Sequence, residues 1–308
     1  MNPDPGQFAP PYRLIYERLT KGLVIPFLGA GASYYRDPSA AAGGDPGKQL
    51  HLPTASELAS YLARKSEFPS GESLDLAKVA QYYSLIGGRT PLYQELHSIF
   101  DRDFPVAPLH TFLASIDHPL LIITTNYDDL IERAFLARGH PFDLVVHTTN
   151  PDLGDRLLWV QHESGVAREI NPNKLDIDLQ TTTVIYKMHG TVDRRRADGD
   201  QYVITEDDYV DFLVRMTKNK AIPSIFAEPF QTSHFLFLGY SLRDWNLRVI
   251  LNRIQTDPRR VSDIVSWGIQ YQPSLMERRF WQKRGVEVYD LLLDDFVRLL
   301  SERRAGGP

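Results

Sequence analysis

The sequence predicts an α/β fold built on a doubly wound, mostly parallel sheet. Two stretches, residues 23–28 and 120–124, are unbroken apolar runs of the kind that parallel strands show when both faces are covered. In the second half of the chain, strand patterns alternate with helix patterns. Several strands also end in glycine or polar residues, at the edge where such sheets bind ligands. Together these features indicate a Rossmann-like domain.

The composition is that of an ordinary globular protein. The chain has 308 residues, of which 43% are hydrophobic and 24% are charged, and its formal charge is −5. The negative charge argues against sequence-specific nucleic-acid binding. Cysteine is absent, which excludes disulfides, thiolate catalysis and every cysteine-ligated zinc or iron–sulfur site.

The first residues give no sign of export or membrane insertion. Residues 1–10 are rich in proline without an apolar core, and no run approaches the roughly 18 apolar residues of a membrane span. We therefore expect a cytoplasmic protein that does not contact a membrane. One domain is expected over residues 12–304, with flexible ends at 1–11 and 305–308.

Helices without intervening strands follow the first predicted strand. A helix over 12–21 precedes strand 23–28, in which Pro26 removes a backbone donor unless its position is unpaired. Residues 36–50 show no periodicity and read as a mobile loop.

Three helices then follow one another, which predicts a helical insertion at about 54–118. They are expected over 54–66, where Thr54 and Glu57 form a capping box, over 73–88 and over 90–100.

The second half of the chain contains most of the predicted sheet. Strands are expected at 120–124, 142–146, 183–188, 235–238, 264–269 and 286–289, with an edge strand at 157–160. Helices are expected from 130 to Gly139, from Thr205, over 244–254, over 275–283 and over 294–300. This alternation is typical of a doubly wound sheet.

A glycine-rich turn follows the first strand. Its residues are Gly29, Ala30, Gly31, Ala32 and Ser33. Glycines let the backbone approach a ligand closely, and a helix starting there would add a partial positive charge of roughly +0.5. Such a turn suits a pyrophosphate, although the third glycine of the dinucleotide fingerprint is absent. Taken without the rest of the chain, the glycine pattern predicts an ordinary turn equally well.

Three other strands end in comparable signatures. The sequence Thr-Thr-Asn-Tyr-Asp ends strand 120–124, Met-His-Gly ends strand 183–188, and Gly-Tyr-Ser ends strand 235–238. Because the carboxyl ends of parallel strands share one edge, we expect all four signatures to surround one ligand.

These four signatures, in this order and spacing, resemble the NAD site of the sirtuin fold, and most closely the sirtuin-like domains of bacterial antiphage defence proteins. The resemblance covers residues 23–300. It implies that His189 is catalytic together with Asn126. It further implies that NAD contacts Gly29, Ala30, Gly31 and Ser33 at the phosphates, Asn126 and Asp128 near the nicotinamide ribose, and Gly239 and Ser241 near the adenosine, with Thr125 as a further binding residue. Thr125 replaces a glutamine of the family.

The resemblance also implies a reaction. Zinc-ribbon sirtuins hold an acylated peptide with a domain that needs four cysteines, so a chain without cysteine is not expected to carry a zinc ribbon or to deacylate proteins. We instead expect hydrolysis of NAD to nicotinamide and ADP-ribose, with NAD as substrate and no metal. By resemblance the chain is a defence effector that depletes NAD, acts as a homo-oligomer and is switched on by a separately encoded activator such as an ATPase.

The two proposed catalytic side chains suit this chemistry. The amide of Asn126 can hold a ribose hydroxyl or a water as donor and acceptor together. The imidazole of His189, with an unperturbed pKa near 6.5, can accept a proton from either. Both residues also have structural readings, since Asn126 could cap a helix, as could Ser241 and Asp244, and His189 could be a buried structural histidine.

Two other functions stay open from the sequence. One is a module that binds NAD or ADP-ribose without turnover and regulates a partner, and the other is a phosphoribosyl or nucleotide-sugar enzyme.

Further candidates are weaker. The run Arg194, Arg195 and Arg196 reads as a solvated face or a contact for an acidic partner. Asp207, Asp208, Asp294 and Asp295 lie at helix starts, where the helix dipole favours acidic groups. Arg36 and Asp37 could reach a ribose from the loop after the glycine turn. The other eight histidines show no metal-ligand spacing.

Overall fold

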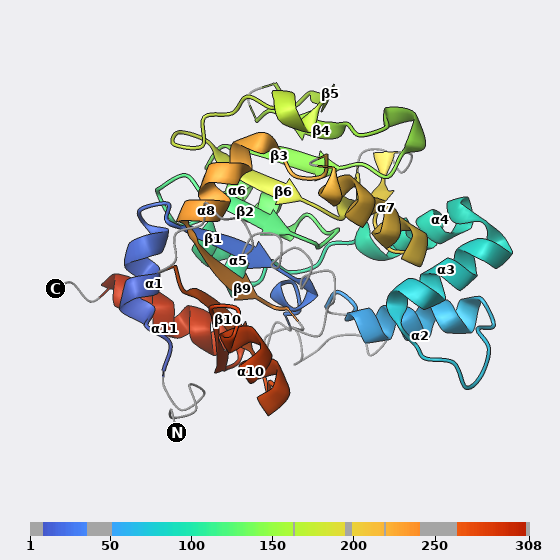
Figure 1. Ribbon diagram of the computed structural model, residues 1–308, viewed down its shortest axis with the longest axis horizontal. Helices are drawn as coiled ribbons and strands as arrows, with labels where there is room; N and C mark the ends of the chain where they lie inside the picture. The colour runs from blue at the N-terminus through green and yellow to red at the C-terminus, as the bar shows by residue number, and fades with distance from the viewer. Residues whose placement is uncertain are drawn as a thin grey trace.

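The computed structural model describes residues 9–35, 51–162, 164–194, 199–218, 220–240 and 264–305. A nine-stranded sheet in the order β11-β10-β9-β1-β2-β6-β3-β4-β5 forms the centre of the molecule (Figure 1). Neighbouring strands from β11 to β3 pair in parallel, whereas β4 and β5 add antiparallel pairs at one edge. The predicted doubly wound α/β fold is confirmed.

The strands lie close to their predicted positions. Their bounds are β1 Val24–Leu28, β2 Leu121–Thr124, β3 Phe142–His147, β4 Leu157–Val160, β5 Ala167–Ile170, β6 Thr183–Lys187, β9 His234–Leu238, β10 Ser266–Gln270 and β11 Val286–Asp290. A separate two-stranded ribbon joins β7 (Gly190–Thr191) to β8 (Gln201–Tyr202). The sequence reading missed β5, β7 and β8, which are too short or too exposed for their alternation to stand out.

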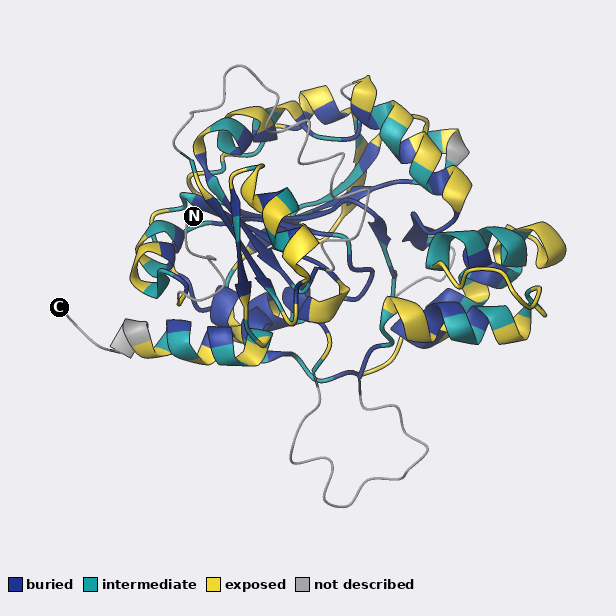
Figure 2. Ribbon diagram, turned by 60° about the horizontal axis from the view of Figure 1, so that its bottom comes forward, coloured by how far each residue is buried: buried dark blue, intermediate teal, exposed yellow. Residues whose placement is uncertain are grey.

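Alternate residues of β1 pack on opposite faces of the sheet. Val24 and Leu28 join one hydrophobic cluster with the helices α1 (Tyr12–Leu19), α5 (Pro108–Leu113), α6 (Leu130–Arg138) and α11 (Leu293–Ala305). Ile25 and Phe27 join a second cluster with α7 (Glu206–Thr217), α8 (Ala227–Thr232) and α10 (Leu275–Gln282). Helices therefore cover both faces, and Figure 2 shows the strands between them as buried.

A group of three helices forms a lobe beside the sheet. These are α2 (Ala55–Lys65), α3 (Leu76–Gly87) and α4 (Arg89–Phe100), at the right of Figure 1. Their apolar faces build a third cluster, which extends to Tyr127 and Tyr202 beside the sheet. The predicted capping box of Thr54 and Glu57 starts α2, but α3 begins at an Asp75 cap rather than at Ser73. The helices α5 and α8 were not predicted, because each has only one to two turns.

Pro26 lies in a central strand, where proline is rare. The carbonyl of Leu28 accepts a hydrogen bond from Thr125 N–H of the β2 side, so the even-numbered residues of β1 face β2. Pairing of β1 with β2 begins only at Phe27 and Ile123. Pro26 therefore lacks its N–H at the point where the β1–β2 ladder starts. The proline costs the sheet a hydrogen bond only at the end of this ladder.

Two properties of the described residues bear on function. None of their helices is long and apolar enough to cross a membrane. No group of three or more His, Asp or Glu side chains among them is placed to hold a metal ion. The helix predicted at 244–254 lies outside the described residues.

Candidate functional site

The four signatures follow four strands that are neighbours in the sheet. Strands β9, β1, β2 and β6 are adjacent in that order, and all three pairs between them are parallel. Their carboxyl ends therefore lie at one edge of the sheet. Loops from four separate parts of the chain meet there, as expected.

The glycine turn packs backbone to backbone against the loop after β9. Gly31 N–H donates to the carbonyl of Gly239 at 2.8 Å, and Gly29 N–H donates to Leu238 O at 3.0 Å. A Cβ on Gly239, whose φ is +71°, would lie 2.0 Å from Ala32 N. Only glycine fits this contact, so the sequence pattern has a structural cause in addition to any ligand.

The glycine turn does not present a series of free backbone N–H groups to a ligand. Residues 30–32 form a single 3₁₀ turn, and Ala32 and Ser33 donate their N–H groups to Gly29 O and Ala30 O. With the bonds of Gly29 and Gly31, four of the turn's N–H groups are used within the protein. No α-helix starts at this turn within the described residues, so its expected dipole is absent there. The surface left to a ligand is the exposed backbone at Ala30 and Gly31.

Asn126 is fastened to the glycine turn by its side chain. Its Nδ2 donates to Gly29 O and to Ser33 Oγ, both at 3.0 Å, and the residue is 9% exposed. A carbonyl only accepts, so this contact fixes which end of the amide is nitrogen. Both amide hydrogens are thus used. The group that Asn126 offers a ligand is its Oδ1 acceptor, rather than a donor and acceptor together.

His189 follows β6 and is held in an aromatic pocket. Its backbone carbonyl accepts a hydrogen bond from Val203 N–H at 2.9 Å, and its ring lies edge-on to Tyr209 and Phe212, each at 5.4 Å between centroids. The residue is 3% exposed, and burial lowers the pKa of His189 to about 3. Its Nε2 is buried and has no hydrogen-bond partner within the protein. At neutral pH the ring is uncharged and retains one unsatisfied nitrogen.

Most of the predicted residues line one cavity of about 190 Å³. Its wall includes Ala30, Ser33, Thr125, Asn126, Asp128, His189 and Gly239. Gly29 and Gly31 support this wall through their contacts with Asn126 and Gly239. Ser241 lies outside the described residues, as do Arg36 and Asp37. The volume is below the roughly 300–1,000 Å³ of most ligand pockets, so the cavity fits one part of a dinucleotide.

Thr125 and Asp128 have partners of their own. Thr125 Oγ1 and the Tyr240 hydroxyl are 2.7 Å apart, which joins the loops after β2 and β9. Asp128 is 6% exposed, and its Oδ1 accepts from Leu130 N–H at the start of α6. The helix-start role foreseen for this segment is therefore performed by Asp128.

Several residues of the site were not predicted. Tyr240 and Tyr209 line the cavity, as do apolar groups of the helical lobe, among them Leu58 and Phe100. Lys187, the last residue of β6, is fully buried beneath the loop that bears Asn126. A lone lysine inside an apolar strand is the signal that could have revealed it.

The weaker candidates have structural roles. Arg194 forms ion pairs with Asp101, Asp103 and Asp129 at 3.6, 3.0 and 3.3 Å, so it is not simply a solvated residue. Arg195 and Arg196 lie outside the described residues. Asp208 completes the capping box at the start of α7.

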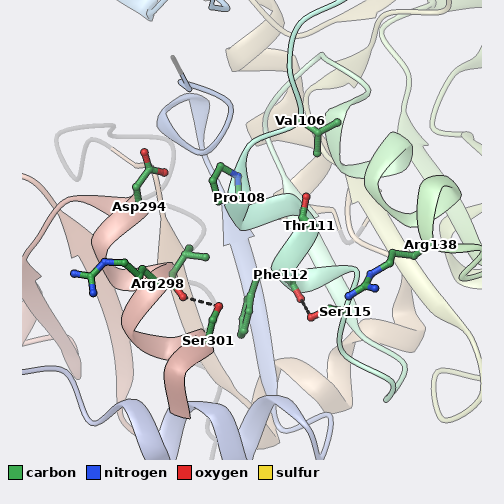
Figure 3. Close-up of a pocket in the computed structure, with 10 residues that line it drawn as sticks. Val106, Pro108, Thr111, Phe112, Ser115, Arg138, Asp294, Arg298 and Ser301 are labelled. Atoms are coloured by element: carbon green, nitrogen blue, oxygen red, sulfur yellow. Dashed lines mark hydrogen bonds between the residues drawn. The ribbon is translucent and has the colours of Figure 1, made fainter. Parts of the chain in front are cut away.

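Two other cavities are formed by different residues. One of about 510 Å³ lies between α5 and α11 (Figure 3), where the hydroxyls of Ser115 and Ser301 already donate to Phe112 O and Val297 O. Another, of about 590 Å³, lies between α4 and residues Thr149 and Asn150, which follow the end of β3. None of the predicted site residues lines either one.

Burial of three histidines predicts acid sensitivity of the fold. It lowers the pKa of His110 to about 4 and those of His147 and His189 to about 3. The unfolded chain binds these protons near pH 6.5, so the stabilising contribution is complete above pH 6.5 and is lost as the pH falls toward the folded values. At pH 5 each histidine should lower the free energy of unfolding by about 2 kcal/mol.

Urea unfolding between pH 7.5 and 5 measures this effect. His147→Phe, which removes one of the three groups, should make the decrease shallower by about one third. An unfolding free energy that stays constant over this range would contradict the prediction.

Comparison with known proteins assigns the fold to a family. The profile of the SIR2-like domain family matches residues 120–289, which is more than half of the chain. The chain belongs to the SIR2-like family. This SIR2-like chain is 25% identical over 234 residues to the Defense-associated sirtuin 2 of Bacillus subtilis. It is 31% identical over 206 residues to the NAD(+) hydrolase ThsA of Enterococcus faecium, and 29% identical over 231 residues to that of Acinetobacter baumannii (strain 532279).

These alignments cover much of the SIR2-like chain but a smaller share of the relatives. They include 74%, 65% and 74% of this chain, and 20%, 36% and 38% of the relatives, respectively. The chain thus spans less than two fifths of each of these longer proteins.

Proposed function

We propose that this chain is an NAD⁺ glycohydrolase. The bond between nicotinamide and C1 of its ribose breaks, and nicotinamide leaves with the bonding electron pair. A water oxygen then bonds to C1 and loses one proton. The products are nicotinamide, ADP-ribose and one proton, so no redox partner is required.

The observation that carries this proposal is the meeting of two unlike polar groups in one cavity. Asn126 lines it with its Oδ1 left as an acceptor, and His189, which also lines it, has a buried ring nitrogen without a protein partner. Buried polar atoms are nearly always hydrogen-bonded, so an unsatisfied nitrogen on a residue that lines the cavity supports a bound hydroxyl or water beside that ring. Three relatives with NAD(+) hydrolase or defence-associated sirtuin names support NAD as that ligand.

In the proposed reaction the protein supplies position and electrostatics. The pyridinium is already a good leaving group, and the transition state has oxocarbenium character, as in other glycosyl cleavages. Asn126 Oδ1 accepts from a ribose hydroxyl or the attacking water and so increases electron density near C1. The neutral ring of His189 accepts a second hydrogen bond and orients the group that loses its proton.

The remaining predicted residues bind the rest of the dinucleotide. In this proposal Ala30 and Gly31 bind the pyrophosphate through their backbone, Asp128 binds near the nicotinamide ribose with Asn126 and Thr125, and Gly239 and Ser241 bind the adenosine side. Binding mostly by backbone and uncharged side chains matches a cavity wall in which Asp128 is the one carboxyl side chain among the described residues.

The proposal includes a role in antiphage defence, supported by the name of the Bacillus subtilis relative. Depletion of NAD is harmful to a cell, so such an enzyme requires control. We place this control in self-association and in a separately encoded activator, for which an ATPase is one candidate.

Chromatography of the products tests the proposed reaction. The purified chain is incubated with NAD, alone and with proteins from neighbouring genes, and nicotinamide and ADP-ribose are quantified. Release of both in equal amounts is the expected result. Intact NAD in every mixture, together with NAD binding by calorimetry, would instead support the binding module considered from the sequence.

A further inference from the structure

Lys187 is a buried cation at the centre of the candidate site's framework. It is the last residue of β6, its exposure is 0%, and it lies two residues before His189. Its Nζ donates to Tyr127 O at 3.2 Å, to Asp128 O, and to Glu132 Oε1 at 2.8 Å. An ammonium has three hydrogens, so these contacts use all of them.

These bonds connect three different parts of the fold. Tyr127 and Asp128 belong to the loop between β2 and α6, directly after Asn126, and Glu132 lies in the first turn of α6. The lysine itself continues into Met188 and His189. One side chain thus ties the loop that bears Asn126 to the strand end that bears His189.

The ammonium of Lys187 supplies a donor to each of three acceptors. Two of the acceptors are backbone carbonyls of one short loop, and that of Tyr127 also accepts from Val192 N–H at 2.9 Å. Buried ion pairs are seldom more stable than apolar replacements of similar size, so stability alone is a weak reason for this arrangement. The relative position of the two loops, which Lys187 fixes, is a stronger reason for the arrangement.

We propose that Lys187 is a positioning residue that sets the location of Asn126 relative to His189 and thereby the rate of NAD hydrolysis. This inference rests on the proposed function. Lys187 does not line the cavity and does not touch the substrate, so it acts through the two loops that it joins.

The test replaces both partners of the Lys187–Glu132 ion pair at once. Lys187→Met combined with Glu132→Gln leaves no unpaired buried charge. The control Lys65→Met with Glu95→Gln makes the same chemical change at a partly exposed ion pair between α2 and α4. Displacement of reacting groups by about 1 Å can lower a rate about 10²-fold. We expect the first double variant to lose about this factor in kcat with at most about a tenfold rise in KM, and the control to match the wild type.

Circular dichroism and thermal unfolding identify the folded fraction of each protein. Should the double variant not fold, Lys187→Arg keeps the charge, but its planar guanidinium cannot reproduce three bonds to the same acceptors. For that variant we expect about a tenfold loss of kcat. A folded variant with wild-type kcat and KM overturns the proposal.

Calorimetry with ADP-ribose separates this inference from the proposed function. Both riboses are present in that ligand, so its affinity reports the position of Asn126 even if the wild type does not hydrolyse NAD. About a tenfold weaker binding by the first double variant supports positioning by Lys187. Unchanged affinity together with unchanged turnover, or unchanged affinity in the absence of any turnover, refutes it.

Discussion

Asn126→Ala should lower kcat for NAD hydrolysis by about 10²–10³-fold, the usual effect of removing one fixed polar group that stabilises a transition state. The loss should appear mainly in kcat, because the glycine turn and the adenosine side retain their contacts. Quantification of released nicotinamide at saturating NAD measures it.

Asn126 also fastens the glycine turn, so the control must separate this role from chemistry. Ser33→Ala removes one of the two acceptors of the Asn126 amide and leaves Oδ1 in place. It should retain kcat within about tenfold, since the bond to Gly29 O persists. Equal losses in the two variants would indicate that Asn126 acts only as a support for the turn.

His189→Ala is expected to lower kcat by about 10²–10⁴-fold, the range in which positioned acid–base groups contribute. The matched control is His147→Ala. His147 is 2% exposed and its ring also contacts Phe212, at 5.0 Å, but it does not line the cavity. Both replacements remove a buried imidazole from one aromatic cluster, so only the His189 change should affect turnover of the folded protein.

The pH dependence of the wild type gives an independent check. Burial lowers the pKa of His189 to about 3, so the ring stays neutral throughout the pH range from 6 to 8. We expect kcat/KM to be constant over this range. A histidine with its ordinary pKa near 6.5 would lose about three quarters of its neutral form at pH 6, and a corresponding decrease in kcat/KM would contradict the assignment.

The sheet was predictable because its strands are buried on both faces. Runs such as 120–124 and 183–188 contain few polar residues, and turn residues mark where they end. The order of the strands within the sheet could not be predicted from these runs, because it depends on contacts between segments far apart in the sequence. The placement of β9 beside β1 is the case that matters, because it brings Gly239 to the glycine turn.

The candidate site was predictable in its members but not in its bonding. The sequence gathered Asn126, His189 and the turn at one sheet edge. It could not show that the turn uses its N–H groups internally, or that the Asn126 amide has no donor left. Lys187 was not predicted as a residue of the site, because its burial depends on a carboxylate 55 positions earlier in the chain.

The contact of Gly31 with Gly239 has a mechanical consequence. No side chain separates the two backbones, so nothing between them can change rotamer and absorb a displacement. A shift of the loop after β9 must therefore move the turn after β1, and through Nδ2 it must also move Asn126. Under the proposed function, we therefore expect a ligand that contacts the loop after β9 to affect the position of Asn126 through these backbone contacts.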